Sequence, residues 1–184
     1  MIGKTHCTRI VFFVALVISL LFGGQAPAAG VNAIDAEALG ALRSLYTSTP
    51  AARSLGREAA GILIFPKIVK AGFIVGAQYG EGVLLRHGRI VGHYNITAAS
   101  YGLQAGVQSF AYAMFFMSQA AMRSLRDRGG LEIGAGPSVV MVDQGMARTL
   151  TSTTLREDVY AFVFGQRGLM AGVGLQGSKI TRIR

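Results

Sequence analysis

Two lysines stand where a chain could hold an anionic group beside an apolar surface. Lys67 and Lys70 flank two apolar residues directly after Pro66. A lysine carries its charge on a flexible stem, so its ammonium can hold a phosphate while apolar neighbours touch acyl chains. The alternative is structural, with Lys70 paired to an internal carboxylate such as that of Glu81 or Glu132. The pattern leaves both roles open.

Three arginines form a second candidate for anion binding. Arg123, Arg126 and Arg128 lie at the end of a short predicted helix. Basic side chains near a helix C-terminus complement the helix dipole. A solvated helix end is therefore the preferred explanation, and an anionic ligand is the alternative.

A glycine-rich segment near the C-terminus has the spacing of a dinucleotide-binding fingerprint, Gly172-x-Gly174-x-x-Gly177. That fingerprint needs a following helix whose N-terminus receives the pyrophosphate. Only seven residues follow Gly177, and they alternate like a strand. We therefore expect no nucleotide and no other cofactor.

Histidines and carboxylates are not spaced for catalysis or for metal binding. His87 and His93 flank a predicted hairpin turn without a placed carboxylate, which makes a weak metal site. Glu157 and Asp158 are adjacent, and a solvated loop explains them better than an acid/base pair. The serines lack the context of a nucleophile elbow. We expect no metal and no enzymatic activity.

The N-terminus has the parts of a secretory signal peptide. Basic residues precede an apolar run at residues 10–22, and Ala26-Pro27-Ala28 supplies a small-x-small cleavage pattern. A membrane-spanning helix needs ~20 apolar residues, so cleavage is preferred over an uncleaved anchor. We expect residues 1–28 to be the signal peptide and residues 29–184 to form one domain.

The cysteine content and the net charge limit which classes of partner are expected. The only cysteine, Cys7, precedes the apolar run, so we expect the exported domain to have no disulfide and no lipoprotein anchor. The domain keeps sixteen basic residues against nine acidic ones. This balance favours anionic partners such as phospholipid headgroups, although solubility alone also explains it. The basic residues are scattered and no base-reading motif is present, so nucleic acid is not expected.

The expected elements change from helical to β at Gly61. Apolar residues at 34, 38, 42 and 45 share one helix face, and Thr49-Pro50 is typical of a second helix start. Residues 69–79 then alternate, with apolar side chains at odd positions and glycine or polar residues at most even ones. Glycines gathered on one face favour strong curvature.

The remaining chain predicts further strands and one short helix. We expect a hairpin turn near Gly88, buried strands at 98–117, a helix from Ser118, a strand at 131–142, a loop at 144–154 and closing strands at 159–164, 169–176 and 179–183. The predicted class is α+β: a strongly curved, mostly antiparallel, barrel-like, glycine-rich sheet with N-terminal helices and one embedded short helix.

Three separated motifs occur in order: GILIFPKIVKAGF at 61–73 with YGEG at 79–82, GLEIGAGPS at 130–138, and GLMAGVGLQGS at 168–178. Together they resemble the SYLF family, also called the Ysc84 domain family, over residues 33–183. The resemblance implies lipid-membrane binding, and for eukaryotic members also actin. It implies no catalytic mechanism. Lys70 matches the lysine of the family's Lys-Ala-Gly-Phe motif.

The first helix departs from some eukaryotic relatives, in which a lysine-rich amphipathic helix opening the domain is held to bind lipid. Here the helix carries Asp35 and Glu37, with only Arg43 as a basic residue. That mechanism is therefore not carried over. Actin is not expected either, because the predicted export places the chain in another compartment.

We thus expect a non-catalytic, exported protein, periplasmic in a Gram-negative bacterium and peripheral to the membrane. It would bind anionic phospholipid or a membrane surface through Lys67, Lys70, Arg123, Arg126 and Arg128. The alternative is an envelope protein-interaction or structural module without direct lipid binding. Lipid binding predicts clustered cations beside exposed apolar groups, whereas the alternative predicts a polar-rimmed apolar patch.

The signal peptide gives the first testable prediction. The mature protein should begin at Ala29 or Gly30, because signal peptidase cleaves after the small-x-small pattern. Intact-mass spectrometry of protein recovered from the periplasm measures this directly. A mass that still includes residues 1–28 would contradict the prediction.

Overall fold

The computed structural model describes residues 31–127, 131–133, 139–142 and 157–183. The chain divides into residues 1–30 and a unit Val31–Arg184, to which all the elements below belong. The predicted signal peptide and the predicted loop at 144–154 lie outside the described residues.

Two helices precede the sheet, as the sequence predicts. Helix α2 spans Val31–Ser48 and α3 spans Pro50–Glu58. Thr49 has extended backbone as the N-cap residue, and Pro50 follows at the first helical position, where its missing N–H costs nothing. No helix in the described ranges combines the length and the apolar character needed to cross a membrane.

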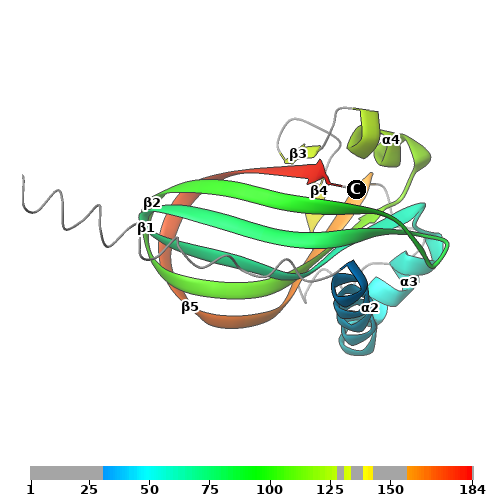
Figure 1. Cartoon of the computed structure of the whole chain (residues 1–184), viewed down its shortest axis with the longest axis horizontal. Helices are drawn as coiled ribbons and strands as arrows, with labels where there is room; N and C mark the ends of the chain where they lie inside the picture. Colours follow the sequence, from blue (N-terminus) through cyan, green and yellow to red (C-terminus); the bar gives the residue numbers. More distant parts are fainter. Residues whose placement is uncertain (1–30, 128–130, 134–138, 143–156, 184) are drawn as a thin grey trace, which may run out of the picture. The chain divides into compact units, whose positions relative to one another are not determined.

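Three unusually long strands form most of the sheet. They are β1 (Gly61–Arg86), β2 (Arg89–Phe116) and β5 (Val159–Arg182), each antiparallel to its neighbour in the order β1-β2-β5. Short β3 (Leu131–Ile133) pairs antiparallel and β4 (Val139–Met141) parallel with β5. Figure 1 shows the three long strands running away from the helices, bending round and returning. The predicted α+β class with a strongly curved, mostly antiparallel sheet is confirmed.

The C-terminal segment differs from the prediction of three strands, because β5 is continuous. Gly165 and Gly168 have φ of 62° and 86° but lie inside β5 rather than in a turn. The pairing with β2 shifts between Ser109 and Ala111 and then resumes. Glycine reaches positive φ without a steric cost, so the strand changes direction through an irregularity instead of ending.

The two arms of the bent β1 approach each other closely. A Cβ built on Gly80 would lie 2.8 Å from the carbonyl oxygen of Lys67, and one on Gly82 would lie 2.6 Å from a ring carbon of Phe65. A Cβ on Gly82 would also collide with the Ile64 carbonyl oxygen. Only glycine allows this contact of strand against strand.

Two hydrophobic clusters lie on opposite faces of the sheet. The inner cluster lies between the arms and includes Phe65 and Ile96, with Met122 from helix α4 (Gln119–Asp127) packed against it. The outer cluster lies between the sheet and helices α2 and α3, and includes Leu45 and Phe115. Both faces of the sheet are therefore buried in the half that lies next to the helices.

Replacing Gly82 with alanine should lower the free energy of unfolding by about 1–3 kcal/mol, because the new methyl group collides with backbone that cannot move aside. Gly40→Ala in α2 is the matched control: its Cβ would meet only the end of Arg43, at 3.9 Å. Alanine there should add roughly 0.5–1 kcal/mol. Denaturant unfolding measures both, and equal stability of Gly82→Ala and wild type would contradict the close approach.

Buried Tyr112 predicts a loss of stability at high pH. Burial raises its pKa from 10.0 to about 12, because the phenolate would lie in the core. Stabilisation from the neutral phenol is complete below pH 10 and is lost as the pH rises through 12. Tyr112→Phe should therefore lose less unfolding free energy than wild type over this interval, by up to ~2–3 kcal/mol. Parallel loss in both proteins would argue against the prediction.

Candidate functional site

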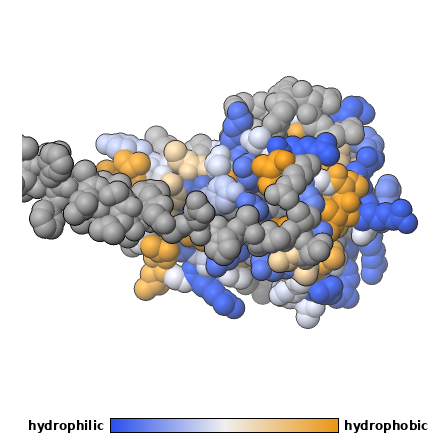
Figure 2. Space-filling view, in the orientation of Figure 1, coloured by the Kyte–Doolittle hydropathy of each residue, from blue (hydrophilic) through white to orange (hydrophobic). Residues whose placement is uncertain are grey.

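Apolar side chains remain exposed where the helices do not cover the sheet. The outer hydrophobic cluster ends before the bend, and beyond it Phe73 is 75% exposed and Leu169 is 88% exposed. We name this surface the bend face; it comprises Val69, Phe73, Ile74, Val75, Tyr79, Tyr101, Val107 and Leu169. Figure 2 shows hydrophobic residues at the end of the molecule where the strands bend.

Strand pairing assembles the bend face from all three long strands. Val107 of β2 lies opposite both Ala71 of β1 and Leu169 of β5, and all three are exposed. In the next rows Val75 lies opposite Tyr101. The residues therefore form one continuous surface although they are far apart in the chain.

The alternation predicted for residues 69–79 is present, but its apolar side faces outward. After the bend, the even positions Gly76 and Gly80 are buried, and Gln78 between them is only 7% exposed. The arms approach too closely here for large side chains to fit between them. Small and polar residues therefore occupy the inside, and the large apolar residues lie outside.

The bend itself is tight at Ile74. This residue has φ of 65°, a left-handed conformation that a β-branched side chain rarely adopts, and the pairing is irregular between Phe73 and Val75. A Cβ on Gly72 would lie 2.6 Å from the Cα of Gly76. Such backbone strain costs of order 1–3 kcal/mol and is frequent at functional sites.

The three stretches of sequence that form the bend carry only positive charges. The stretches 66–79, 97–109 and 165–179 contain four lysines and arginines and no aspartate or glutamate. Lys67 and Arg167 are exposed. Lys70 is half-buried, lies at an even position and interacts with neighbouring groups. The two predicted lysines therefore differ: Lys67 is exposed to solvent, and Lys70 is partly buried.

The carboxylates considered as partners of Lys70 lie near the bend face. Glu81 accepts a hydrogen bond of 2.7 Å from the Tyr79 hydroxyl. Burial, this hydrogen bond and the charge of Glu81 together raise the pKa of Tyr79 to about 12, burial being the largest cause. Glu132 lies in β3 opposite Lys179.

The predicted arginine group lies elsewhere. Arg123 is exposed on α4, and Arg126 belongs to the same helix, whereas Arg128 lies outside the described residues. Met122 of α4 contacts Gly61 at the start of β1, away from the bend. Helix α4, which carries Arg123 and Arg126, lies at the other end of the sheet from the bend (Figure 1).

The two histidines considered as a metal site also lie apart, in different surroundings. His93 Nε2 lies 2.8 Å from Asp35 Oδ1 and joins β2 to α2, while His87 occupies the β1–β2 turn with φ of 49°. In the parts of the chain that the structure describes, no three metal-ligating side chains gather. The contact between His93 and Asp35 carried no sequence signal, because the two residues meet only through packing of a helix on a strand.

Comparison of the sequence with known protein families found a match. Residues 97–183 match the sequence model of the Ysc84 family, whose description is "Las17-binding protein actin regulator". No curated protein matches the chain significantly. The matched segment contains most of β2 and all of β5, the strands that build much of the bend face. Residues 97–183 of this chain thus match the Ysc84 family, also called the SYLF family.

Proposed function

We propose that this protein is a non-catalytic domain that binds anionic membrane surfaces through the bend face. The observation that carries the proposal is the exposure of large apolar residues beside cations, in stretches without a carboxylate. Contiguous exposed apolar surface marks an interaction site. Basic side chains next to it suit phospholipid headgroups.

The composition of the bend face fits the membrane interface. Phe73 and Leu169 present apolar surface, and full burial of such a side chain contributes about 1.5–3 kcal/mol. Tyr101 is 69% exposed, and tyrosine prefers the boundary between headgroups and acyl chains. Lys67 and Arg167 would each add ~1 kcal/mol near an anionic surface. Together these contributions support reversible, peripheral binding.

The second candidate is binding of a protein partner in the cell envelope. The family description, which names Las17 binding, favours a protein partner in general. Cores of protein interfaces are depleted of lysine, however, and Lys67 is exposed beside the bend face. The cationic bend face therefore favours lipid as the first choice.

We further propose that the protein is exported, periplasmic in a Gram-negative bacterium and peripheral to the membrane. The tripartite N-terminal pattern supports export. No nucleic acid, nucleotide, metal or other cofactor belongs to the proposal.

Co-sedimentation with vesicles tests membrane binding. The mature protein should bind phosphatidylglycerol vesicles more tightly than phosphatidylcholine vesicles, and salt should weaken the binding because it screens exposed charges. Phe73→Gln and Leu169→Gln should each weaken binding several-fold through lost apolar contact. Lys67→Gln and Arg167→Gln should each weaken it about fivefold.

Val91→Gln is the matched control, because Val91 is an exposed apolar residue of β2 that lies outside the bend face. It should bind as wild type. Lys70→Gln separates the two roles of Lys70: loss of folding shows a structural role, and loss of binding with the fold intact shows a headgroup role. Wild-type protein that binds no anionic vesicle at low salt would overturn the proposal in favour of a protein partner.

A further inference from the structure

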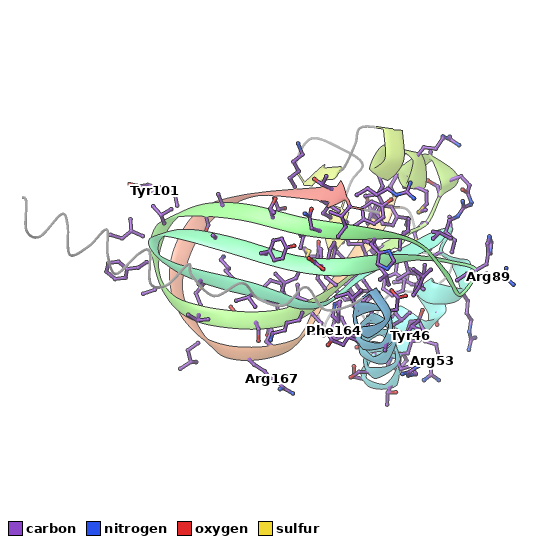
Figure 3. All side chains as sticks on the ribbon, viewed as in Figure 1. Tyr46, Arg53, Arg89, Tyr101, Phe164 and Arg167 are labelled. Carbon is purple, nitrogen blue, oxygen red and sulfur yellow. The ribbon has the colours of Figure 1, made fainter. Side chains whose placement is uncertain are left out.

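An open pocket of about 510 Å³ lies between helices α2 and α3. It is separate from the bend face. Its lining is formed by Arg43, Tyr46, Thr47, Arg53, Gly56 and Arg57. None of these residues belongs to the bend face or to the residues predicted to bind lipid. Figure 3 shows Tyr46 and Arg53 close to each other beside α2.

Within the part of the chain that the structure describes, no carboxylate pairs with the arginines of this pocket. Arg43, Arg53 and Arg57 come from two helices and are all exposed. Arg53 and Arg57 are four residues apart on α3, a spacing at which like charges repel. Across the described residues the ion pair present joins His93 to Asp35, and no carboxylate lies within 4.0 Å of the three guanidinium groups. A bound anion would relieve the repulsion.

The pocket contains a neutral hydrogen-bond donor as well. Gly56 leaves room for the ring of Tyr46, because a Cβ at residue 56 would lie 2.8 Å from the ring carbon that carries the hydroxyl. The ring also contacts Phe115, with centroids 6.4 Å apart, so its position is fixed from the core side. Burial raises the pKa of Tyr46, which keeps the hydroxyl protonated. Among the described residues this hydroxyl has no hydrogen-bond partner, whereas Thr47 donates to the Arg43 carbonyl.

We propose that the pocket formed by Arg43, Arg53, Arg57 and Tyr46 binds a phosphate group. Guanidinium groups bind phosphate oxygens through paired N–H donors, and three of them around one pocket match a multiply charged phosphate better than a single carboxylate. The Tyr46 hydroxyl supplies an additional donor. The phosphate can come from a free phosphorylated molecule or from a lipid headgroup. The site is independent of the bend face.

Isothermal titration calorimetry with inorganic pyrophosphate at low salt tests the site. Wild-type protein should bind, and Arg53→Gln/Arg57→Gln should bind at least about tenfold more weakly, because two charge-assisted contacts are lost. The variant Tyr46→Phe should bind pyrophosphate more weakly, because it lacks the hydroxyl donor, and its melting temperature should stay within a few degrees of that of wild type. Arg89→Gln, an exposed arginine outside the pocket lining, should bind as wild type.

The source of the phosphate is decided by two further ligands. Phosphatidic acid vesicles present a monoester headgroup, and glycerol 3-phosphate presents the same group without acyl chains. If the headgroup is the ligand, the double arginine variant loses affinity for both; if a free molecule is the ligand, it loses affinity for glycerol 3-phosphate alone.

Failure of this proposal is distinguishable from failure of membrane binding. Phe73→Gln should weaken vesicle binding several-fold but keep pyrophosphate binding, because it changes only the bend face. Equal affinity of wild type and the double arginine variant for pyrophosphate, or no binding by wild type at millimolar pyrophosphate, overturns the phosphate site whatever the vesicles show.

Discussion

Close contact between the two arms of β1 is the constraint on which the rest of the domain depends. Gly80 and Gly82 bring backbone against backbone, so the space inside the folded sheet is narrow along this part of the strand. Large apolar side chains fit inside only nearer the helices, where Phe65 and Ile96 pack with α4. Farther along, the inside holds glycine and buried Gln78, and the apolar residues of the alternating pattern lie outside. The exposed bend face thus follows from how the sheet closes.

Coverage by the helices divides the outer face of the sheet into two regions with different chemistry. Where α2 and α3 pack, residues such as Leu85 and Phe162 are buried by helical partners. Beyond the helices the same face carries Val107 and Leu169 in solvent. The arginines of the α2–α3 pocket lie on the covering helices, so the domain presents separate surfaces for apolar and for phosphate contacts. The proposed membrane contact and the proposed phosphate contact would therefore not compete.

Local patterns in the sequence predicted where helices and strands occur better than they predicted where one strand continues and where it ends. Thr49-Pro50 fixed the start of α3, and alternation after Gly61 identified β1, because both signals act over a few residues. The breaks expected at Gly165 and Gly177 were wrong, since a glycine that ends a strand and a glycine that bends one look alike in sequence. Lys67 was selected from its apolar neighbours and is exposed, and its role in binding stays a prediction. The pocket of Arg43, Arg53 and Arg57 was not predicted. Those arginines converge only because two helices pack at a particular angle, and spacing along the chain does not report that angle.

The two hydrophobic clusters share the same strands, and this links their contributions to stability. Leu63 belongs to the inner cluster and its neighbour Ile64 to the outer one, and Met114 and Phe115 divide in the same way. A strand that moves to relax one cluster must displace side chains of the other, because successive residues point to opposite faces. The free energies of the two clusters are therefore coupled, and their effects do not add as they would for independent sites. We therefore expect the sheet and both hydrophobic clusters to unfold together, so that neither cluster unfolds while the other stays packed.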